Sequence, residues 1–244
     1  MLYPHKNLLL ALTASGALLG APHATAQALC ASDGQTPPST LVERFINSDC
    51  AACWAAAPHR AEAKNALFID WIVPASAGED AALSAAATSD ALVRLAALGK
   101  AVPMADDSVR TAVANPSPAG TLRVAHGLAL NGYVGTSISF SPTKSARAAG
   151  PLQAWLVLVE TVAADTQGSA VERNLVRNLL QLDWTAPQAL QKPQALQMLQ
   201  YKELRPMAVH SNTNPARLRL VGWVQNAQGQ VLAAAQSQCA PQEQ

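Results

Sequence analysis

The chain has 244 residues, and 17 lysine and arginine residues against 16 aspartate and glutamate residues give a net charge of +1 at pH 7. Such a balance leaves no basic field to attract nucleic acid or an anionic membrane surface, so we expect no nucleic-acid partner. Half of the residues are hydrophobic but only 5% are aromatic, and much of the hydrophobic share is alanine. We therefore expect the five tryptophans to anchor the packing of the core.

The first residues, Met1–Ala26, have the composition of a cleavable signal peptide. Lys6 and the amino terminus form a short basic region, and residues 8–20 are apolar and uncharged. This apolar run is shorter than the roughly 20 residues that span a bilayer. We expect cleavage after Ala26, secretion to the periplasm and no membrane span after cleavage. Lipoprotein processing at Cys30 is the alternative.

The stretch from Thr40 to Pro58 indicates a strand, a turn and a helix. An apolar run comes first, polar residues 47–49 follow, and Cys50 and Cys53 then precede an alanine-rich segment of helical character. Free N–H groups at a helix N-terminus favour a thiolate at Cys50. Cys53 is close enough along the chain to close a reversible disulfide. The pattern predicts a redox dithiol, with Cys50 as the attacking thiol and Cys53 as the resolving thiol.

Pro58 lies five residues after Cys53, where thioredoxin-like proteins carry a helix-kinking proline, so the segment resembles the thioredoxin superfamily. It is more similar still to an uncharacterised family of secreted thioredoxin-like bacterial proteins. That family has a Val-Glu-x-Phe strand shortly before its Cys-x-x-Cys, and Val42–Phe45 matches it. Asn174–Leu179 is similar to the family's Asn-Val-Val-Arg-x-Leu. The resemblance implies a thioredoxin-like fold and no settled activity.

Two acidic residues bear on the chemistry of the cysteine pair. Asp49 departs from the family pattern, where a small residue is common, and its negative charge would oppose thiolate formation. Glu43 lies on the strand that leads to the cysteines and could act as a buried proton relay behind Cys53. The alternative is a surface glutamate paired with Arg44.

The next elements extend the α/β pattern. Residues 67–73 read as a buried strand, and residues 76–98 as an alanine-rich helix, interrupted near residues 88–90, that ends at Gly99. Strand, helix, strand, helix predicts parallel strands joined by right-handed crossovers. Thioredoxin-like folds place a cis-proline beside the dithiol, and Pro103 is the candidate; an ordinary trans-proline is the alternative.

Beyond the turn-rich residues 115–120 the pattern becomes that of strands. The strand-like segments are 122–140, 153–161, 217–225 and 230–236, with a hairpin turn between the last two. Residues 171–180 fit a short helix or a bulged strand. The expected fold class is therefore α/β: a thioredoxin-like region over residues 30–115, followed by a mainly antiparallel β-rich region over residues 120–239 that packs on it.

The four cysteines allow three pairings. We expect Cys50–Cys53 as the redox pair and Cys30–Cys239 as a structural disulfide that joins the two ends of the mature chain. Alternatively, the two terminal cysteines stay unpaired in their tails. No second Cys-x-x-Cys is present, and His126 and His210 have no partners at ligand spacing, so we expect no metal site and no cofactor.

Two functions remain open, because no hydrolase, zinc-protease or nucleotide-binding motif is present. The first is a periplasmic thiol–disulfide oxidoreductase that acts on protein thiols or disulfides through Cys50 and Cys53. The second is a non-catalytic secreted binding or scaffold protein in which the same disulfide is structural. Copper handling through the dithiol is a weaker third, since thiolates suit Cu(I).

Overall fold

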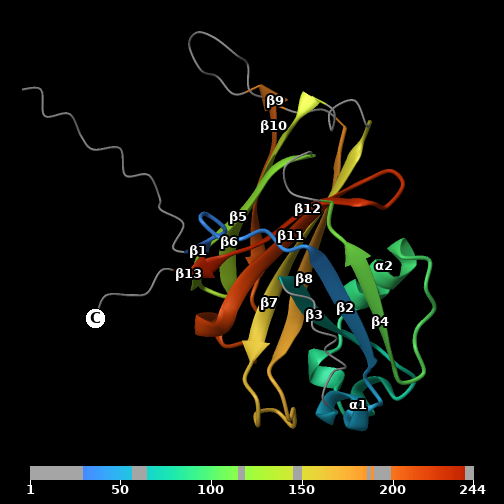
Figure 1. Ribbon diagram of the computed structural model, residues 1–244. Helices are drawn as coiled ribbons and strands as arrows, with labels where there is room; N and C mark the ends of the chain where they lie inside the picture. Colours follow the sequence, from blue (N-terminus) through green and yellow to red (C-terminus); the bar gives the residue numbers. More distant parts are fainter. Residues whose placement is uncertain are drawn as a thin grey trace, which may run out of the picture.

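The computed structural model describes residues 30–56, 65–114, 119–144, 150–185, 188–189 and 199–239. The expected signal segment, Met1–Ala26, and Pro58 lie outside these residues. Within the described ranges, strands dominate and form two sheets (Figure 1). No helix in these ranges has the length and apolar character that crossing a membrane requires.

The first sheet has six strands in the order β13-β1-β5-β6-β10-β9. They are β1 (Cys30–Ala31), β5 (Gly120–Leu130), β6 (Tyr133–Pro142), β9 (Gln188–Ala189), β10 (Leu199–Ala208) and β13 (Gln238–Cys239). Every neighbouring pair is antiparallel. The long β5–β6 hairpin turns at Asn131 and Gly132, which both have positive φ, the backbone conformation that tight two-residue hairpins require.

The second sheet has seven strands in the order β12-β11-β7-β8-β3-β2-β4. They are β2 (Thr40–Asn47), β3 (Ala66–Val73), β4 (Asp106–Ala112), β7 (Leu152–Val162), β8 (Arg173–Trp184), β11 (Leu218–Asn226) and β12 (Val231–Gln236). β3 runs parallel to both of its neighbours, β2 and β8, and the other pairs are antiparallel. Strands from residues 30–115 and from residues 120–239 therefore share this sheet.

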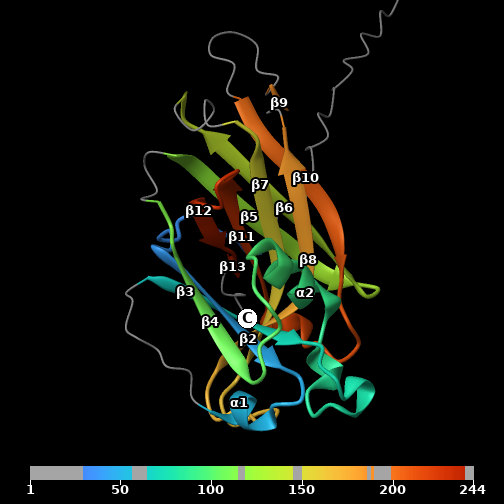
Figure 2. The same cartoon turned by 90° about the vertical axis from the view of Figure 1, so that its right-hand side faces the viewer.

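The seven-stranded sheet lies between the six-stranded sheet and helix α2 (Figures 1 and 2), and each of its faces carries a hydrophobic cluster. One face packs against β5 and β6 of the first sheet, with Val124, Ile138 and Phe140 meeting Leu156 and Leu220. The other face is covered by helix α2 (Ser89–Ala97), and its core residues include Phe45, Trp71, Trp155, Trp223 and Leu95. All five tryptophans are buried, as expected.

Gly222 on β11 permits the close approach of the two sheets. A Cβ atom at this position would lie 2.6 Å from Cγ1 of Val124 and 3.1 Å from Cδ1 of Ile138. Both contacts are shorter than ordinary van der Waals separations, so a side chain here would push the sheets apart. Glycine at position 222 thus sets the spacing between β11 and the β5–β6 hairpin.

Helices are few and short in the described ranges. α1 (Ala51–Ala55) follows β2 directly, and α2 (Ser89–Ala97) follows two 3-10 turns at Gly78–Asp80 and Ser84–Ala86; a third 3-10 turn, Pro215–Arg217, precedes β11. The helix expected over residues 76–98 forms only from Ser89 onward. It ends before Gly99, whose φ of +64° suits the left-handed C-terminal position of a helix.

The expected α/β fold class with a thioredoxin-like N-terminal half is wrong: the fold is mostly β, built from two sheets. The strand–helix–parallel strand order of β2, α1 and β3 was predicted correctly. The sheet is then extended by β8, which pairs with β3 at Asp70 and Leu175, and by the antiparallel strands beyond it. Pairings between segments so distant in sequence leave no trace in local periodicity, which is why the α/β prediction failed.

The strands expected in the second half are present. Residues 173–184 form the bulged strand that was one of two alternatives: Leu158 on β7 faces Asn178 and Val159 faces Val176, so Arg177 is the extra residue. The hairpin expected around residues 226–229 joins β11 and β12.

Candidate redox site

Cys50 and Cys53 are joined by a disulfide at the start of α1, at one end of the seven-stranded sheet (Figures 1 and 2). Cys50 occupies the N-cap position, and its Sγ accepts a hydrogen bond of 3.2 Å from the backbone N–H of Cys53. Both cysteines are half-buried, and Ala51 and Ala52 between them are exposed. The disulfide therefore belongs to a partly exposed segment, and one of its sulfurs already receives a backbone donor.

Two buried arginines bind the carbonyls at the C-terminal end of α1. Arg44 on β2 donates from its NH2 group to the carbonyl of Cys53 at 2.8 Å. Arg173 on β8 donates to the carbonyls of Trp54, at 2.7 Å, and Ala56. A helix leaves its last carbonyls without intrahelical partners, and cations are favourable there. The two guanidinium groups supply both the missing donors and the positive charge.

Each of these arginines is itself held by a carboxylate. Nε of Arg44 lies 2.8 Å from Oδ2 of Asp106 at the start of β4, and NH1 of Arg173 lies 3.6 Å from Oδ1 of Asp70 on β3. The short helix is therefore tied to strands β2, β3, β4 and β8. This anchoring explains how a helix of five residues keeps a fixed position.

Trp54 is the buried residue of α1, and its cluster fixes the inner side of this helix. Its side chain is buried with Ile46, Ile72 and Leu175, and its indole N–H donates to the carbonyl of Gln167 at 2.7 Å. The guanidinium of Arg173 lies 5.3 Å from the centre of the Trp54 ring system, within cation–π range.

A cavity of about 520 Å³ adjoins Cys53. Its lining residues include Cys53, Ala52, Phe68, Arg44, Asp106 and Arg110. The lining combines apolar side chains with charged groups of both signs, and Cys53, one of the two disulfide residues, is part of it. A peptide segment or a small thiol could approach the disulfide from this side.

The loop before the disulfide is held by Asn47. Its side-chain amide donates to the carbonyl of Pro103 at 2.9 Å, and its side-chain oxygen accepts from the backbone N–H of Asp49 at 2.9 Å. The Asp49 carboxylate is exposed and accepts a hydrogen bond from the hydroxyl of Ser76 at 3.1 Å. Asn47 thus connects the segment around Pro103 to the turn that leads to Cys50.

The carbonyl of Pro103 therefore contacts Asn47, in the segment that leads to the disulfide, and the peptide bond of Pro103 is trans. No described residue has a cis peptide bond, so the cis alternative is wrong.

Glu43 is buried, but in a different setting from either sequence alternative. Its carboxylate accepts two hydrogen bonds from Arg94 of α2, at 2.8 and 2.6 Å. Successive strand residues point to opposite faces of a sheet. Arg44 points toward α1 and contacts Cys53, so Glu43 points to the α2 face instead.

The terminal disulfide Cys30–Cys239 is present, as predicted. Cys30 on β1 is buried, Cys239 on β13 is exposed, and the two residues are directly paired across the two short strands. The alternative in which both cysteines stay unpaired is wrong.

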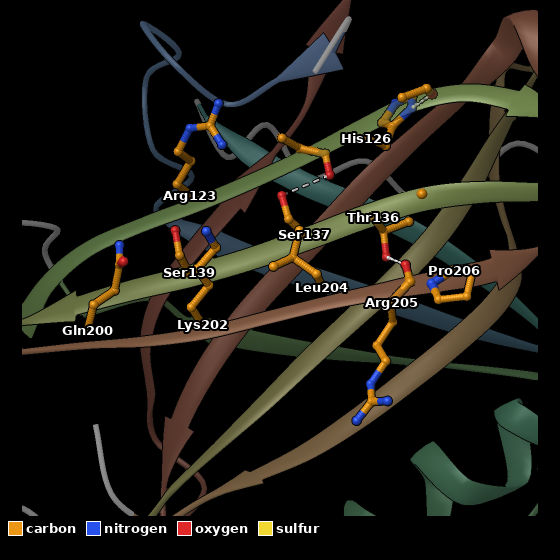
Figure 3. Close-up of a pocket in the computed structure, with 13 residues that line it drawn as sticks. Arg123, His126, Thr136, Ser137, Ser139, Gln200, Lys202, Leu204, Arg205 and Pro206 are labelled. Carbon is orange, nitrogen blue, oxygen red and sulfur yellow. Dashed lines mark hydrogen bonds between the residues drawn. The ribbon is translucent and has the colours of Figure 1, made fainter. Parts of the chain in front are cut away.

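A wider groove of about 990 Å³ lies across β5, β6 and β10 of the six-stranded sheet (Figure 3). Arg123, Lys202, Ser137 and Ser139 point into it. Arg123 is paired with Asp33 at 2.7 Å. No cysteine lines this groove, which is separate from the cavity beside Cys53.

Sequence reasoning missed Arg44 and Arg173 as parts of the site. A signal for Arg44 was available, because in β2 it shares the face of Val42 and Ile46 and so stands at a position expected to be buried. For Arg173 the sequence offers no comparable signal, since its partners come from α1 and β3.

No family model matches the chain, and no curated protein matches it. A solved structure, HBP35 of Porphyromonas gingivalis, is similar with a TM-score of 0.48 and 9% sequence identity, over 86% of this chain and 80% of that chain. At this level the similarity carries no argument about fold or activity.

Proposed function

We propose that the protein is a thiol–disulfide oxidoreductase of the periplasm that uses Cys50 and Cys53 and acts on protein thiols or disulfides. The observation that carries this proposal is the half-buried disulfide at the edge of the cavity lined by Cys53 and Arg44. Partial exposure and an adjoining cavity are what a substrate thiol needs in order to approach the disulfide. The presence of two disulfides also suits an oxidising compartment.

The exchange proceeds in two balanced steps. A substrate thiolate attacks Sγ of Cys50, a mixed disulfide forms, and the Cys50–Cys53 bond breaks with Cys53 leaving as a thiolate. A second substrate thiolate then attacks the substrate sulfur of the mixed disulfide, so the substrate is oxidised and Cys50 is released. The two electrons end on the Cys50–Cys53 pair, which takes up two protons as it becomes a dithiol. The reverse sequence reduces a substrate disulfide.

The local hydrogen bonds support Cys50 as the reactive cysteine, whose sulfur attacks a substrate disulfide or is attacked by a substrate thiolate. The N–H of Cys53 already points at Sγ of Cys50, and a hydrogen bond to a thiolate favours the charged form. The buried guanidinium of Arg44 fixes the carbonyl of Cys53 and so holds the turn that carries both cysteines. Asp49 acts in the opposite direction.

The second candidate is a binding or scaffold protein with a structural Cys50–Cys53 disulfide. The observation in its favour is the anchoring of α1 by Arg44 and Arg173, which holds the carbonyls of Cys53 and Trp54 through bonds that do not involve the sulfurs. In this function the segment that carries Cys50 and Cys53 would be rigid in both the oxidised and the reduced protein.

The reduction potential of Cys50–Cys53 separates the two functions. It should be measured against glutathione in a Cys30→Ser/Cys239→Ser variant, which retains only the pair in question. An oxidoreductase requires a potential above about −300 mV, whereas a structural disulfide lies below it. Cys53→Ser should also trap mixed disulfides with partner proteins, since the resolving thiol is lost. A potential below that value together with no trapped partner would refute the proposal.

A further inference from the structure

A second group of side chains with metal-binding chemistry lies at the β13–β1 edge of the six-stranded sheet. Cys30 on β1 is directly opposite Cys239 on one neighbouring strand and His126 on the other. Directly opposed residues of antiparallel strands project to the same face of the sheet. The two sulfurs and a ring nitrogen of His126 accordingly lie within 4.8 Å of one another.

The imidazole of His126 has the hydrogen-bonding state that a metal ligand needs. Its Nδ1 lies 2.9 Å from the carbonyl oxygen of Gly127, and a carbonyl only accepts, so Nδ1 carries the proton. Nε2 therefore presents its lone pair. The side chain is 4% exposed, and Nε2 has no hydrogen-bond partner among the described residues. Metal-binding histidines commonly donate their second ring N–H to a backbone carbonyl in this way.

The electrostatic setting of His126 agrees with this role. Burial lowers the pKa of His126, because an imidazolium is poorly solvated there, while the hydrogen bond to Gly127 acts in the opposite direction. A neutral imidazole is the form that binds a metal. A buried ring nitrogen without a partner costs free energy that a bound ion would recover.

The group is open on the side of Cys239. This residue is exposed and lines a cavity of about 540 Å³ together with Thr161, Arg217, Arg219 and Glu172. His126 also borders the groove of Figure 3, on the β5 strand that carries Arg123. A reductant can therefore reach the sulfur of Cys239, and a water molecule can reach an ion held beside it.

We propose that reduction of the Cys30–Cys239 disulfide creates a Zn²⁺ site formed by the two thiolates and Nε2 of His126, with water as the fourth ligand. Two sulfur ligands and one imidazole form a donor set that zinc accepts, and an open fourth position is the usual arrangement when the protein supplies three ligands. β13, which carries Cys239, is an edge strand with exposed residues. The sulfurs can thus separate to the roughly 3.8 Å that two Zn–S bonds of about 2.3 Å require.

An external dithiol supplies the electrons and protons that reduce the Cys30–Cys239 disulfide. The dithiol is oxidised to its disulfide, its two electrons break the Cys30–Cys239 bond, and its two protons pass to the cysteine sulfurs. Zinc binding then releases those two protons to solvent, and the neutral His126 releases none. The oxidised protein has no thiolate to offer, so zinc binding depends on the redox state.

The test uses the full mature chain carrying Cys50→Ser/Cys53→Ser, so that the terminal pair supplies the only thiols. The protein is reduced with a phosphine without oxygen and titrated with Co²⁺, then with Zn²⁺. We expect one ion per reduced chain, a thiolate-to-cobalt charge-transfer band, displacement of Co²⁺ by Zn²⁺, and no binding to the oxidised chain. His126→Ala should weaken binding at least ~10-fold, as the loss of a ligand requires.

His210→Ala is the matched control, because His210 is an exposed histidine that does not belong to this group, and it should bind zinc as the parent does. The control also covers the case in which reduction unfolds the chain. Two thiols of an unfolded chain would bind zinc without preferring His126 over His210. Equal affinity of the two histidine variants, or equal binding to the oxidised and reduced chains, would overturn the proposal.

Discussion

The guanidinium of Arg44 donates a hydrogen bond of 2.8 Å to the main-chain carbonyl of Cys53. The same side chain pairs with Asp106 at 2.8 Å and is almost fully buried. One residue of β2 thus connects the Cys-x-x-Cys helix to the start of β4. A buried charge thus holds the main chain of one of the two disulfide cysteines.

Arg44→Met should destabilise the protein by about 1–3 kcal/mol, because the carbonyl of Cys53 and the carboxylate of Asp106 lose a buried donor. It should also shift the Cys50–Cys53 reduction potential, which a change in stability alone would not do. Chemical denaturation and glutathione equilibration measure the two effects. Arg123→Met, which breaks an exposed ion pair with Asp33 in the other sheet, should change stability by less than about 1 kcal/mol and leave the potential unchanged.

The pair of Glu43 and Arg94 makes a different prediction. Both side chains are fully buried, and the guanidinium also lies 4.6 Å from the centre of the Trp155 ring system. Removing one partner leaves the other charge buried and uncompensated, so Arg94→Met should cost about 3–5 kcal/mol. Glu43→Leu/Arg94→Met, which removes both charges, should be less destabilised than Arg94→Met alone. Thermal unfolding of the two variants decides this, and equal losses would contradict it.

Gly222→Ala tests the spacing between the two sheets. The added Cβ would lie 2.6 Å from Cγ1 of Val124, and overpacking of this kind typically costs about 1–3 kcal/mol. Gly135→Ala is the control, because a Cβ there meets no atom within 4 Å. Should both substitutions prove equally mild in denaturant unfolding, Gly222 would not limit the approach of the sheets.

The sequence predicted the local elements and failed on how they assemble. The strand over residues 40–47, the Cys-x-x-Cys helix and the parallel strand over residues 66–73 follow from apolar runs and a turn between them. The β3–β8 pairing joins Asp70 to Leu175, and no pattern near either residue encodes it. Residues 76–88 form two 3-10 turns because alanine favours a helix but buries too little surface to hold one.

For the candidate sites, the number and spacing of the cysteines predicted both disulfides, whereas the residues that support these sites were not predicted. Glu43 was expected near Cys53 or Arg44, and its partner Arg94 comes from α2. His126 was set aside for lack of a partner at ligand spacing, and it meets Cys30 only through the pairing of β1 with β5. Ligands brought together by sheet register are invisible to spacing rules.

The last prediction concerns the charge beside the dithiol. Asp49 is exposed, next to Cys50 in sequence, and its negative charge disfavours a thiolate there. In the reduced Cys53→Ser protein, Asp49→Asn should therefore speed alkylation of Cys50 by a neutral reagent by roughly 1.5- to 5-fold, the range that exposed charge interactions support. Ser76→Ala removes the hydrogen bond to Asp49 but keeps the charge, so it should alkylate at nearly the parent rate. If Ser76→Ala accelerates the reaction as much as Asp49→Asn, the hydrogen bond and not the charge controls Cys50. High salt provides a second check, because it screens an exposed charge and should reduce the difference between Asp49→Asn and the parent.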